Sequence, residues 1–268
     1  MNRLVTGKLA LAAFLICAAA VTTHAQTTFT SLVNFDPTTG ARPGWSLIQG
    51  LNGNLYGTTA LDGANAYGTI FEATPAGAVK VLHNFCSTQN CTDGIGPGIL
   101  LLGTDGNIYG AADQGGNIQL CPYVNTGCGT IFKMTPQGAL TTLYSFCSQT
   151  NCADGATAVA LVQVGSGDFY GATFEGGAHQ SGTVFKITKQ GNLTTLYSFC
   201  PQRPTCTDGY TPTGLVQGAN GNFYGTTAGG GTNNQGTVFE ITPAGALTTL
   251  YSFCSQSNCS DGAGPEGG

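Results

Sequence analysis

The stretch that decides the fold is residues 211–262, TPTGLVQGANGNFYGTTAGGGTNNQGTVFEITPAGALTTLYSFCSQSNCSDG. It holds four short apolar runs, at residues 214–217, 222–227, 236–242 and 246–253. Ala-Asn-Gly at 219–221 and Pro-Ala-Gly at 243–245 separate the paired runs, and both words are typical of tight turns. The stretch therefore predicts four short antiparallel strands joined in one sheet.

The fourth run indicates what lies on the two sides of this sheet. Strict alternation would point one set of side chains to one face and the other set to the opposite face. The first set is Leu247, Thr249, Tyr251 and Phe253, and the second is Thr248, Leu250 and Ser252. Because both faces carry apolar or threonine side chains, we expect the sheet to pack between two neighbouring sheets.

The same pattern occurs in four tandem copies, at about 42–94, 95–155, 156–209 and 210–262. Each copy has a Tyr-Gly step, with its tyrosine at Tyr56, Tyr109, Tyr170 or Tyr224. An additional segment, Asn117–Cys128, lengthens the second copy. Four antiparallel strands in a repeat of about 40–50 residues are the signature of a β-propeller blade. The sequence therefore predicts an all-β fold, a β-propeller of four-stranded antiparallel blades over residues 26–268.

Both ends of the repeat region are offset from the copies. TFTSLVNF at 28–35 matches the fourth run of a copy, which suits a propeller that completes one blade with strands from both chain ends. AGPEGG at 263–268 stands where a fifth copy would begin. We expect a sequence that is incomplete at its C-terminus, and the alternative is four blades in an open or strained ring.

Residues 1–25 have the pattern of a signal peptide. Arg3 and Lys8 precede an apolar run from Leu9 to Val21, and Thr23-His24-Ala25 offers small residues for cleavage before Gln26. An uncleaved anchor and a lipoprotein modified at Cys17 are the alternatives. No later segment is long and apolar enough to cross a membrane. The sequence therefore predicts a protein that is secreted or displayed at the cell surface.

The cysteines agree with export. Apart from Cys17, ten cysteines fall as five close pairs: Cys86 with Cys91, Cys121 with Cys128, Cys147 with Cys152, Cys200 with Cys206, and Cys254 with Cys259. An even, locally paired set in a chain with a leader predicts disulfides, which we interpret as staples on exposed loops. A metal site would need pairs that converge in space together with histidine partners. We therefore expect no metal and no cofactor.

Charge excludes one class of partner. The formal net charge is −5, charged residues make up 8% of the chain, and no Lys/Arg cluster follows residue 8. Nucleic-acid binding needs a basic surface, so we expect no nucleic-acid partner.

The repeated words GNFYGTT, GTVFEITPAGALTTLYSF and the closing Asp-Gly resemble the GloVer tandem repeat of exported bacterial proteins, over residues 28–262. The resemblance implies an extracellular propeller-like repeat protein, in a family whose members often carry a C-terminal sorting or anchoring segment. It implies no biochemical activity and supplies no catalytic residues.

Several polar residues return in every copy. Asp93, Asp154, Asp208 and Asp261 precede glycine and could bind calcium or a sugar, but an Asp-Gly turn explains them more simply. Asn54, Asn107, Asp168 and Asn222 are interpreted as turn residues in the same way. The Tyr-Gly tyrosines could form a sugar platform, but we expect them to pack between blades with the hydroxyl bonded to backbone.

Residues that break the repeat are better candidates for ligand contact, because the fold does not require them. These candidates are Trp45, Tyr123 in the additional segment, Glu175 and His179. Glu175 and His179 could act as an acid–base pair, although such a pair in a Gly-rich loop is usually solvent-exposed. No motif for catalysis or phosphate binding is present, so we expect no catalytic residues.

The leading hypothesis is a non-enzymatic extracellular module that binds a glycan or an envelope protein. The alternative is a carbohydrate-active hydrolase or lyase on a propeller scaffold, which would need two carboxylates converging in one pocket. A purely structural surface protein is the third hypothesis.

Overall fold

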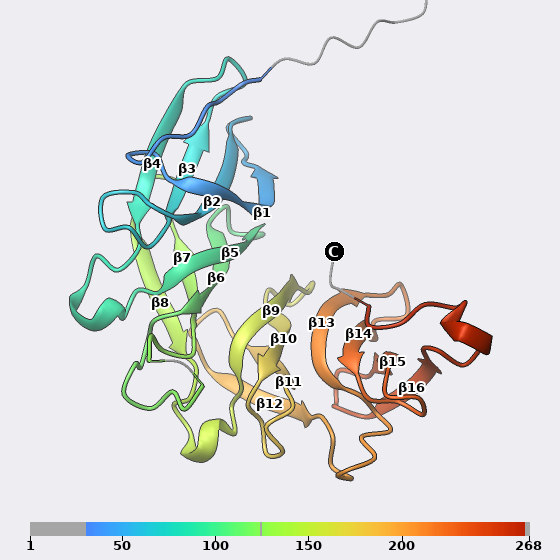
Figure 1. Ribbon diagram of the computed structural model, residues 1–268. Coiled ribbons are helices and arrows are strands. Elements are labelled where there is room, and N and C mark those ends of the chain that lie inside the picture. Colours follow the sequence, from blue (N-terminus) through green and yellow to red (C-terminus); the bar gives the residue numbers. More distant parts are fainter. Residues whose placement is uncertain (1–30, 124, 266–268) are drawn as a thin grey trace, which may run out of the picture. The chain divides into compact units, whose positions relative to one another are not determined.

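The computed structural model describes residues 31–123 and 125–265, and the side chain of Trp45 lies outside the described part. The expected signal peptide and residues 28–30 also lie outside it. Within these residues the chain forms four antiparallel sheets of four strands each, which we call blades 1 to 4 (Figure 1). The prediction of an all-β fold with four repeated sheets is confirmed.

Each blade takes its strands in sequence order, so that neighbouring strands along the chain pair with each other. Blade 1 contains β1 (Ala41–Gln49), β2 (Leu55–Leu61), β3 (Thr69–Ala73) and β4 (Val79–Asn84). Blade 2 contains β5 (Ile95–Leu102), β6 (Ile108–Gln114), β7 (Thr130–Met134) and β8 (Leu140–Ser145). Blade 3 contains β9 (Ala156–Gln163), β10 (Phe169–Glu175), β11 (Thr183–Ile187) and β12 (Leu193–Ser198). Blade 4 contains β13 (Tyr210–Gln217), β14 (Phe223–Gly229), β15 (Thr237–Ile241) and β16 (Leu247–Ser252). The short 3₁₀ helices η1 (Gln89–Cys91), η2 (Thr150–Cys152) and η3 (Ser257–Cys259) follow β4, β8 and β16.

The glycine of the Tyr-Gly step is required by close packing across the blade. A Cβ on Gly171 would lie 2.3 Å from the ring of Phe185, which stands opposite it on β11. The same approach, at 2.4–2.5 Å, occurs at Gly57, Gly110 and Gly225. Real Cβ atoms do not come this close to an aromatic ring, so the phenylalanine of the third strand explains the glycine of the second.

Apolar side chains fill the space between successive blades. Between blades 2 and 3, buried Tyr109 packs with its ring centroid 4.4 Å from that of Phe169. Between blades 3 and 4, Tyr170 stacks on Phe223 at 4.2 Å. The expectation that these tyrosines pack between blades therefore fits the structure, and the sugar-platform alternative does not.

The hydroxyl partners of these tyrosines differ from the expected backbone groups. Tyr109 donates to Asp105 Oδ2 at 2.9 Å, and Tyr224 donates to Glu240 Oε1 at 2.8 Å. A carboxylate from a turn (Asp105) or from the neighbouring strand (Glu240) can reach the hydroxyl without breaking the hydrogen bonds between strands, whose backbone groups are already paired.

Two expectations about individual strands need correction. β13 begins at Tyr210 rather than at Gly214. The first residues of the strand were not recognised in the sequence, because they include Thr211, with φ 58°, and Pro212, which are unusual inside strands. The alternation expected along the fourth run is broken by an irregularity, since Val238 pairs with Tyr251 and the adjacent Phe239 pairs with Thr249. Leu250 is the extra residue of this bulge, which a period-two pattern does not reveal.

The up-and-down order places all the longer connections at one end of each blade. The second strand ends, and the first strand begins, at this same end, which we call the loop end. It carries the loops 62–68, 115–129, 176–182 and 230–236, together with the cysteine-containing loops 86–94, 146–155, 199–209 and 253–262. Within the described residues, no helix is long and apolar enough to cross a membrane.

Candidate functional site

The repeated aspartates at the loop end organise the cysteine-containing loops. Asp154 Oδ2 accepts hydrogen bonds from the Ser148 amide at 2.9 Å and the Tyr144 hydroxyl at 2.8 Å. Asp208 makes the same pair of contacts with the Cys200 amide and Tyr197, both at 2.9 Å. Burial and this contact raise the pKa of Tyr197, which keeps the hydroxyl as a donor. These carboxylates serve their own loops, which fits the turn interpretation better than a ring of calcium ligands.

The structure joins all five predicted cysteine pairs as disulfides, with Cα–Cα distances of 4.0–5.3 Å. The interpretation of the bridges as staples on exposed loops needs correction at the second and third copies. Cys147 and Cys152 are 1% and 2% exposed, and Cys200 and Cys206 are 0% and 8% exposed. The Cys206 carbonyl oxygen accepts hydrogen bonds from the amides of Gly209 and Gly231, both at 2.9 Å, which hold this disulfide loop against the loop 230–236 of blade 4. The Cys91 carbonyl oxygen accepts the same pair of bonds from Gly94 and Gly116, although its bridge is only half-buried.

Two of the cysteine pairs converge in space, although no histidine joins them. Cys128 Sγ lies 2.8 Å from Cys147 Sγ, so the bridges of Cys121 with Cys128 and of Cys147 with Cys152 form one cluster of four sulfurs. Because each sulfur is already bonded in a disulfide, the cluster offers no thiolate ligand to a metal. It fixes the additional segment of copy 2 to the core of its blade.

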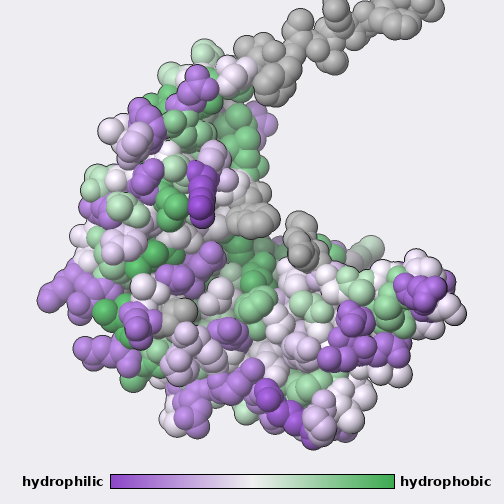
Figure 2. Space-filling view, in the orientation of Figure 1, coloured by the Kyte–Doolittle hydropathy of each residue, from purple (hydrophilic) through white to green (hydrophobic). Residues whose placement is uncertain are grey.

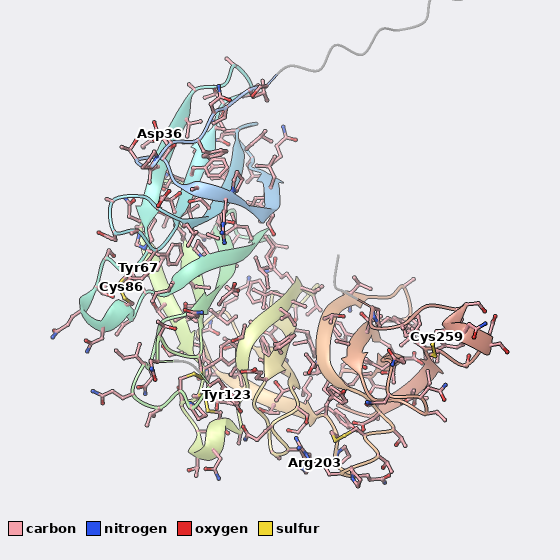
Figure 3. All side chains as sticks on the ribbon, in the orientation of Figure 1. Asp36, Tyr67, Cys86, Tyr123, Arg203 and Cys259 are labelled. Atoms are coloured by element: carbon pink, nitrogen blue, oxygen red, sulfur yellow. A yellow bond between two sulfur atoms is a disulfide. The ribbon has the colours of Figure 1, made fainter. Side chains whose placement is uncertain are left out.

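The additional segment, Asn117–Cys128, reaches from blade 2 to the loop of blade 3 (Figure 3). The Tyr123 hydroxyl donates to Gln180 Oε1. Gln180 Nε2 in turn donates to the carbonyl oxygen of Asn151 at 2.7 Å. At its base, Thr126 Oγ1 donates to Gln114 Oε1 at 2.6 Å. The described residues of the segment therefore contact both blades.

Glu175 ends β10 near this segment. Burial raises the pKa of the Tyr123 phenol, and the nearby charge of Glu175 raises it further. Burial also raises the pKa of Glu175, which has no ion-pair partner in the part of the chain that the structure describes. The structure thus brings Tyr123 and Glu175, predicted separately, into one electrostatic environment.

His179 does not pair with Glu175. No ion pair or hydrogen bond joins their side chains within the described residues, so the structure gives no support to an acid–base pair. Instead the His179 carbonyl accepts a hydrogen bond from the Arg203 guanidinium, which also donates to Ser181 Oγ at 2.8 Å. Trp45 lies elsewhere, in the middle of β1 where the register shifts between Pro43 and Leu47.

A polar pocket of about 340 Å³ lies between the first cysteine-containing loop and the additional segment. Its side chains are almost all amides and hydroxyls, and none is charged: Asn90, Thr92, Asn117, Gln119, Ser145 and Ser148, with Gly116 and Ile118. Such groups suit a neutral ligand with many hydroxyls, because each amide can donate and accept at once. Sequence analysis singled out the additional segment but not these residues, since single hydroxyls and amides carry no motif.

Asp113 is a second feature that sequence analysis did not single out. It stands next to the last residue of β6, and the surrounding protein raises its pKa to about 6 although the residue is exposed. It has no ion-pair partner among the described residues.

Comparison with known proteins gives a family and a fold. The family described as the Gloeobacter/Verrucomicrobia repeat matches residues 20–207 and 123–268, which confirms the resemblance stated from the repeated words. No curated protein matches the chain.

Among solved structures, a catalytically inactive virginiamycin B lyase from Staphylococcus aureus with quinupristin is 16% identical, with a TM-score of 0.54. The alignment covers 84% of this chain and 58% of the lyase, so the chain spans less than two thirds of that protein. A protein of unknown function from Dyadobacter fermentans is 11% identical with a TM-score of 0.51, covering 81% of this chain and 69% of that one. At these identities the likeness shows the propeller-type fold alone.

Proposed function

Since the chain belongs to the Gloeobacter/Verrucomicrobia repeat family, which brings no activity with it, we propose a function from the site: an exported binding module that holds a neutral glycan at the loop end. The observation that carries the proposal is the uncharged polar pocket between residues 90–92 and 116–119. One wall belongs to a repeated loop and the other to the additional segment. A residue set that the fold does not require thus completes the pocket.

The order of the additional segment supports a binding role. The disulfide between Cys121 and Cys128 closes the segment on itself, and hydrogen bonds from Thr126 to Gln114 and from Tyr123 to Gln180 tie it to blades 2 and 3. A wall that is fixed before the ligand arrives loses little conformational entropy on binding. Export is supported by the leader sequence at 1–25 and by the five disulfides, which persist in oxidising compartments.

The experiment is titration calorimetry of the mature chain with neutral oligosaccharides chosen from a glycan array. Asn117→Ala and Gln119→Ala remove amides from the pocket and should each weaken binding about tenfold, as expected for one lost hydrogen bond. Gln217→Ala, an exposed amide at the opposite end of blade 4, is the matched control and should bind as the parent does. Absence of binding to any glycan, or equal losses in all three variants, would refute the proposal.

A second candidate function is a hydrolase or lyase for carbohydrates. It is favoured by one observation, namely that Asp113, next to the end of β6, and Glu175, at the end of β10, lie on the second strands of neighbouring blades and both have raised pKa values. A carboxyl that keeps its proton near neutral pH can act as a general acid. If this function is correct, Asp113→Asn and Glu175→Gln should each abolish the formation of product from the glycan, while binding of the glycan persists. Binding without turnover in the parent would leave the module non-enzymatic.

A further inference from the structure

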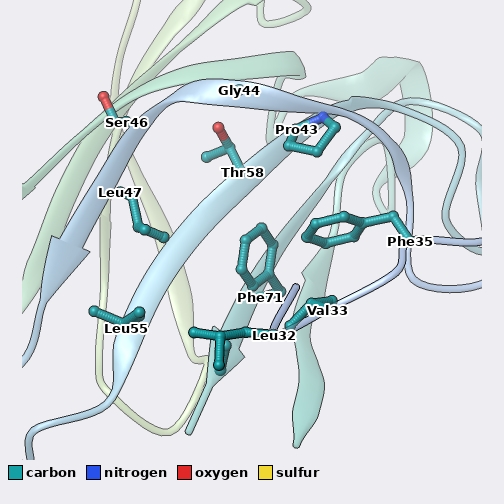
Figure 4. A pocket seen from close by; sticks show the side chains of 11 residues that line it. Leu32, Val33, Phe35, Pro43, Gly44, Ser46, Leu47, Leu55, Thr58 and Phe71 are labelled. Atoms are coloured by element: carbon teal, nitrogen blue, oxygen red, sulfur yellow. The ribbon is translucent and has the colours of Figure 1, made fainter. Parts of the chain in front are cut away.

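Reactive side chains lie beside the polar pocket rather than beside the apolar one. An apolar pocket of about 270 Å³ on blade 1 is lined by β1, β2, β3 and residues 32–35, and its lining includes no titratable side chain (Figure 4). Figure 2 shows the hydrophobic surface over this blade. The polar pocket, in contrast, borders the four-sulfur cluster of copy 2, because Gln119 precedes Cys121 by two residues and Ser148 directly follows Cys147.

The strand register sets two cysteines of this cluster opposite each other. Beyond the paired strands β7 and β8, Phe146 N donates to the carbonyl oxygen of Gly129 at 3.0 Å. The next residues in this antiparallel register are Cys147 and Cys128. Facing residues of such a pair have Cα atoms about 4.5–5.5 Å apart, a separation that a disulfide can span. Their Sγ atoms lie 2.8 Å apart, although each is bonded to another cysteine.

Copy 2 alone has this arrangement among the described blades. The same amide-to-carbonyl bond joins Phe85 to Gly68, Phe199 to Gly182 and Phe253 to Gly236. At the next position the facing pairs are Cys86 with Tyr67, Cys200 with Ser181, and Cys254 with Gln235. The second cysteine is therefore particular to the copy that also carries the additional segment.

The four sulfurs differ in their exposure. Cys121 is half-buried, whereas Cys128, Cys147 and Cys152 are 1–2% exposed and belong to the apolar core of the blade. Which sulfur of a disulfide is attacked depends on access, so a thiolate from solvent meets Cys121 first.

We propose that the cluster is a thiol–disulfide exchange site that regulates the polar pocket. A low-molecular-weight thiol converts the pairing of Cys121 with Cys128 and Cys147 with Cys152 into the pairing of Cys121 with Cys152 and Cys128 with Cys147.

The exchange takes three displacements. The external thiolate bonds to Cys121 Sγ, and the electron pair of the broken bond goes to Cys128 Sγ. Cys128 then bonds to Cys147 and releases Cys152 as a thiolate, whose Sγ lies 3.9 Å from the carbonyl oxygen of Leu120 and so beside Cys121. Cys152 bonds to Cys121 and releases the external thiolate. The chain holds two disulfides before and after, and the thiol is returned unchanged.

The exchange alters the wall of the polar pocket, a consequence that rests on the proposed function. In the pairing of the structure, the bridge of Cys121 closes the additional segment on itself. After exchange it ties Cys121 to the loop 146–155, which moves Gln119 relative to Ser148. Since both side chains line the pocket, we expect the exchanged form to bind the glycan more weakly.

The first test uses Cys152→Ser, which leaves Cys147 as a thiol against the bridge of Cys121 with Cys128. Exchange passes the free thiol to half-buried Cys121, where the thiolate is better solvated than in the core. After incubation at mildly alkaline pH, acid quenching, unfolding and alkylation, peptide mapping should find more than half of the label on Cys121.

The matched control is Cys206→Ser in blade 3. It leaves Cys200, which is as buried as Cys147 but faces Ser181, so the label should stay on Cys200 alone. A label confined to Cys147 in Cys152→Ser would overturn the proposal.

A second variant keeps the proposal testable if Cys152→Ser does not fold. Cys121→Ser/Cys152→Ser leaves Cys128 and Cys147 as the free cysteines of the cluster. We expect air oxidation to join them, with the loss of two hydrogen atoms from the mass of the chain. Two thiols that persist in the folded, oxidised variant would contradict the proposal.

The consequence for the pocket is measured on the parent chain. Incubation with less than one equivalent of reduced glutathione should give the exchanged pairing in disulfide mapping, and the fraction of chains that bind glycan in calorimetry should fall by the same fraction. Exchange with unchanged glycan binding would refute the regulation. Exchange in a chain that binds no glycan before or after treatment would refute the proposed function and leave the exchange site standing. Unchanged bridges in a chain that binds glycan would do the reverse.

Discussion

The hydroxyl of Tyr197 donates a 2.9 Å hydrogen bond to Asp208 Oδ2, joining the outer strand of blade 3 to the loop that leads into blade 4. The same carboxylate oxygen accepts the amide of Cys200, so one aspartate ties together a strand, a disulfide-containing loop and the next blade. Tyr144 and Asp154 repeat this arrangement one blade earlier.

Replacing Asp208 should therefore destabilise the protein more than its short side chain suggests. Asp208→Ala leaves the buried amide of Cys200 and the half-buried hydroxyl of Tyr197 without an acceptor, at a cost of about 1–3 kcal/mol in the free energy of unfolding. The matched control is Asp168→Ala, which removes a partly exposed ion pair with Lys186 and should cost at most about 1 kcal/mol. Chemical denaturation of both variants measures the difference. Equal costs would show that Asp208 is no more than a turn residue.

Blade 1 departs from this pattern at one position, since His83 takes the place of the tyrosine and contacts Asp93 Oδ2 at 3.1 Å. We expect His83→Tyr to be tolerated and to raise the melting temperature slightly, because the other described blades accommodate the phenol beside the same carboxylate. Tyr144→His makes the reverse change in blade 2 and should lower the melting temperature. Thermal unfolding of the two variants tests the pair, and a marked loss of stability in His83→Tyr would contradict it.

Sequence patterns predicted the fold well because each copy repeats the same turn words and the same apolar runs. They predicted the blade count and the cysteine partners for the same reason. They did not predict the burial of the disulfides in copies 2 and 3, nor the bulge at Leu250. A bulge is a shift in pairing between two strands rather than a property of either one.

The site was predictable only in part. Tyr123 and Glu175 stood out because they break the repeat, and the structure places them together. The pocket at Asn117 and Gln119 could not be predicted, since its other wall comes from a different copy whose distance from the segment depends on blade packing. Asp113 was not singled out, because desolvation is a property of the folded surroundings.

Asp113 should give the protein a characteristic pH dependence. Its pKa is raised to about 6 from an ordinary value of 3.8, so the folded state binds a proton more readily than the unfolded state between these values. Stability from this group is fully present below about pH 4 and is lost as pH rises through about 6. Asp113→Asn should remove this loss. The melting temperature of the variant, relative to that of the parent, should therefore rise between pH 4 and pH 7.

Asp36 supplies the control of opposite sign. Hydrogen bonds from Thr38 and Thr39 lower the pKa of Asp36 to about 2, so its contribution is present above about pH 4 and is lost as pH falls. Asp36→Asn should therefore melt at a lower temperature than the parent near neutral pH, and the difference should shrink as the pH falls below about 4. If the melting temperatures of the parent and of Asp113→Asn change in the same way with pH between pH 4 and 7, the pKa of Asp113 is not raised.

The Tyr-Gly step should tolerate no side chain at its glycine. Gly171→Ala would place a methyl group 2.3 Å from the Phe185 ring and 2.5 Å from the Ala160 carbonyl oxygen, so either the ring or the strand must move. Overpacking of this kind costs about 1–3 kcal/mol in the free energy of unfolding. Gly165→Ala is the control, because nothing lies within 4 Å of its Cβ position. In the double variant Gly171→Ala/Phe185→Leu, the smaller side chain makes room for the methyl group, so adding Gly171→Ala should cost less than it does beside phenylalanine. If the alanine costs as much beside leucine as beside phenylalanine, the ring is not the reason for the glycine.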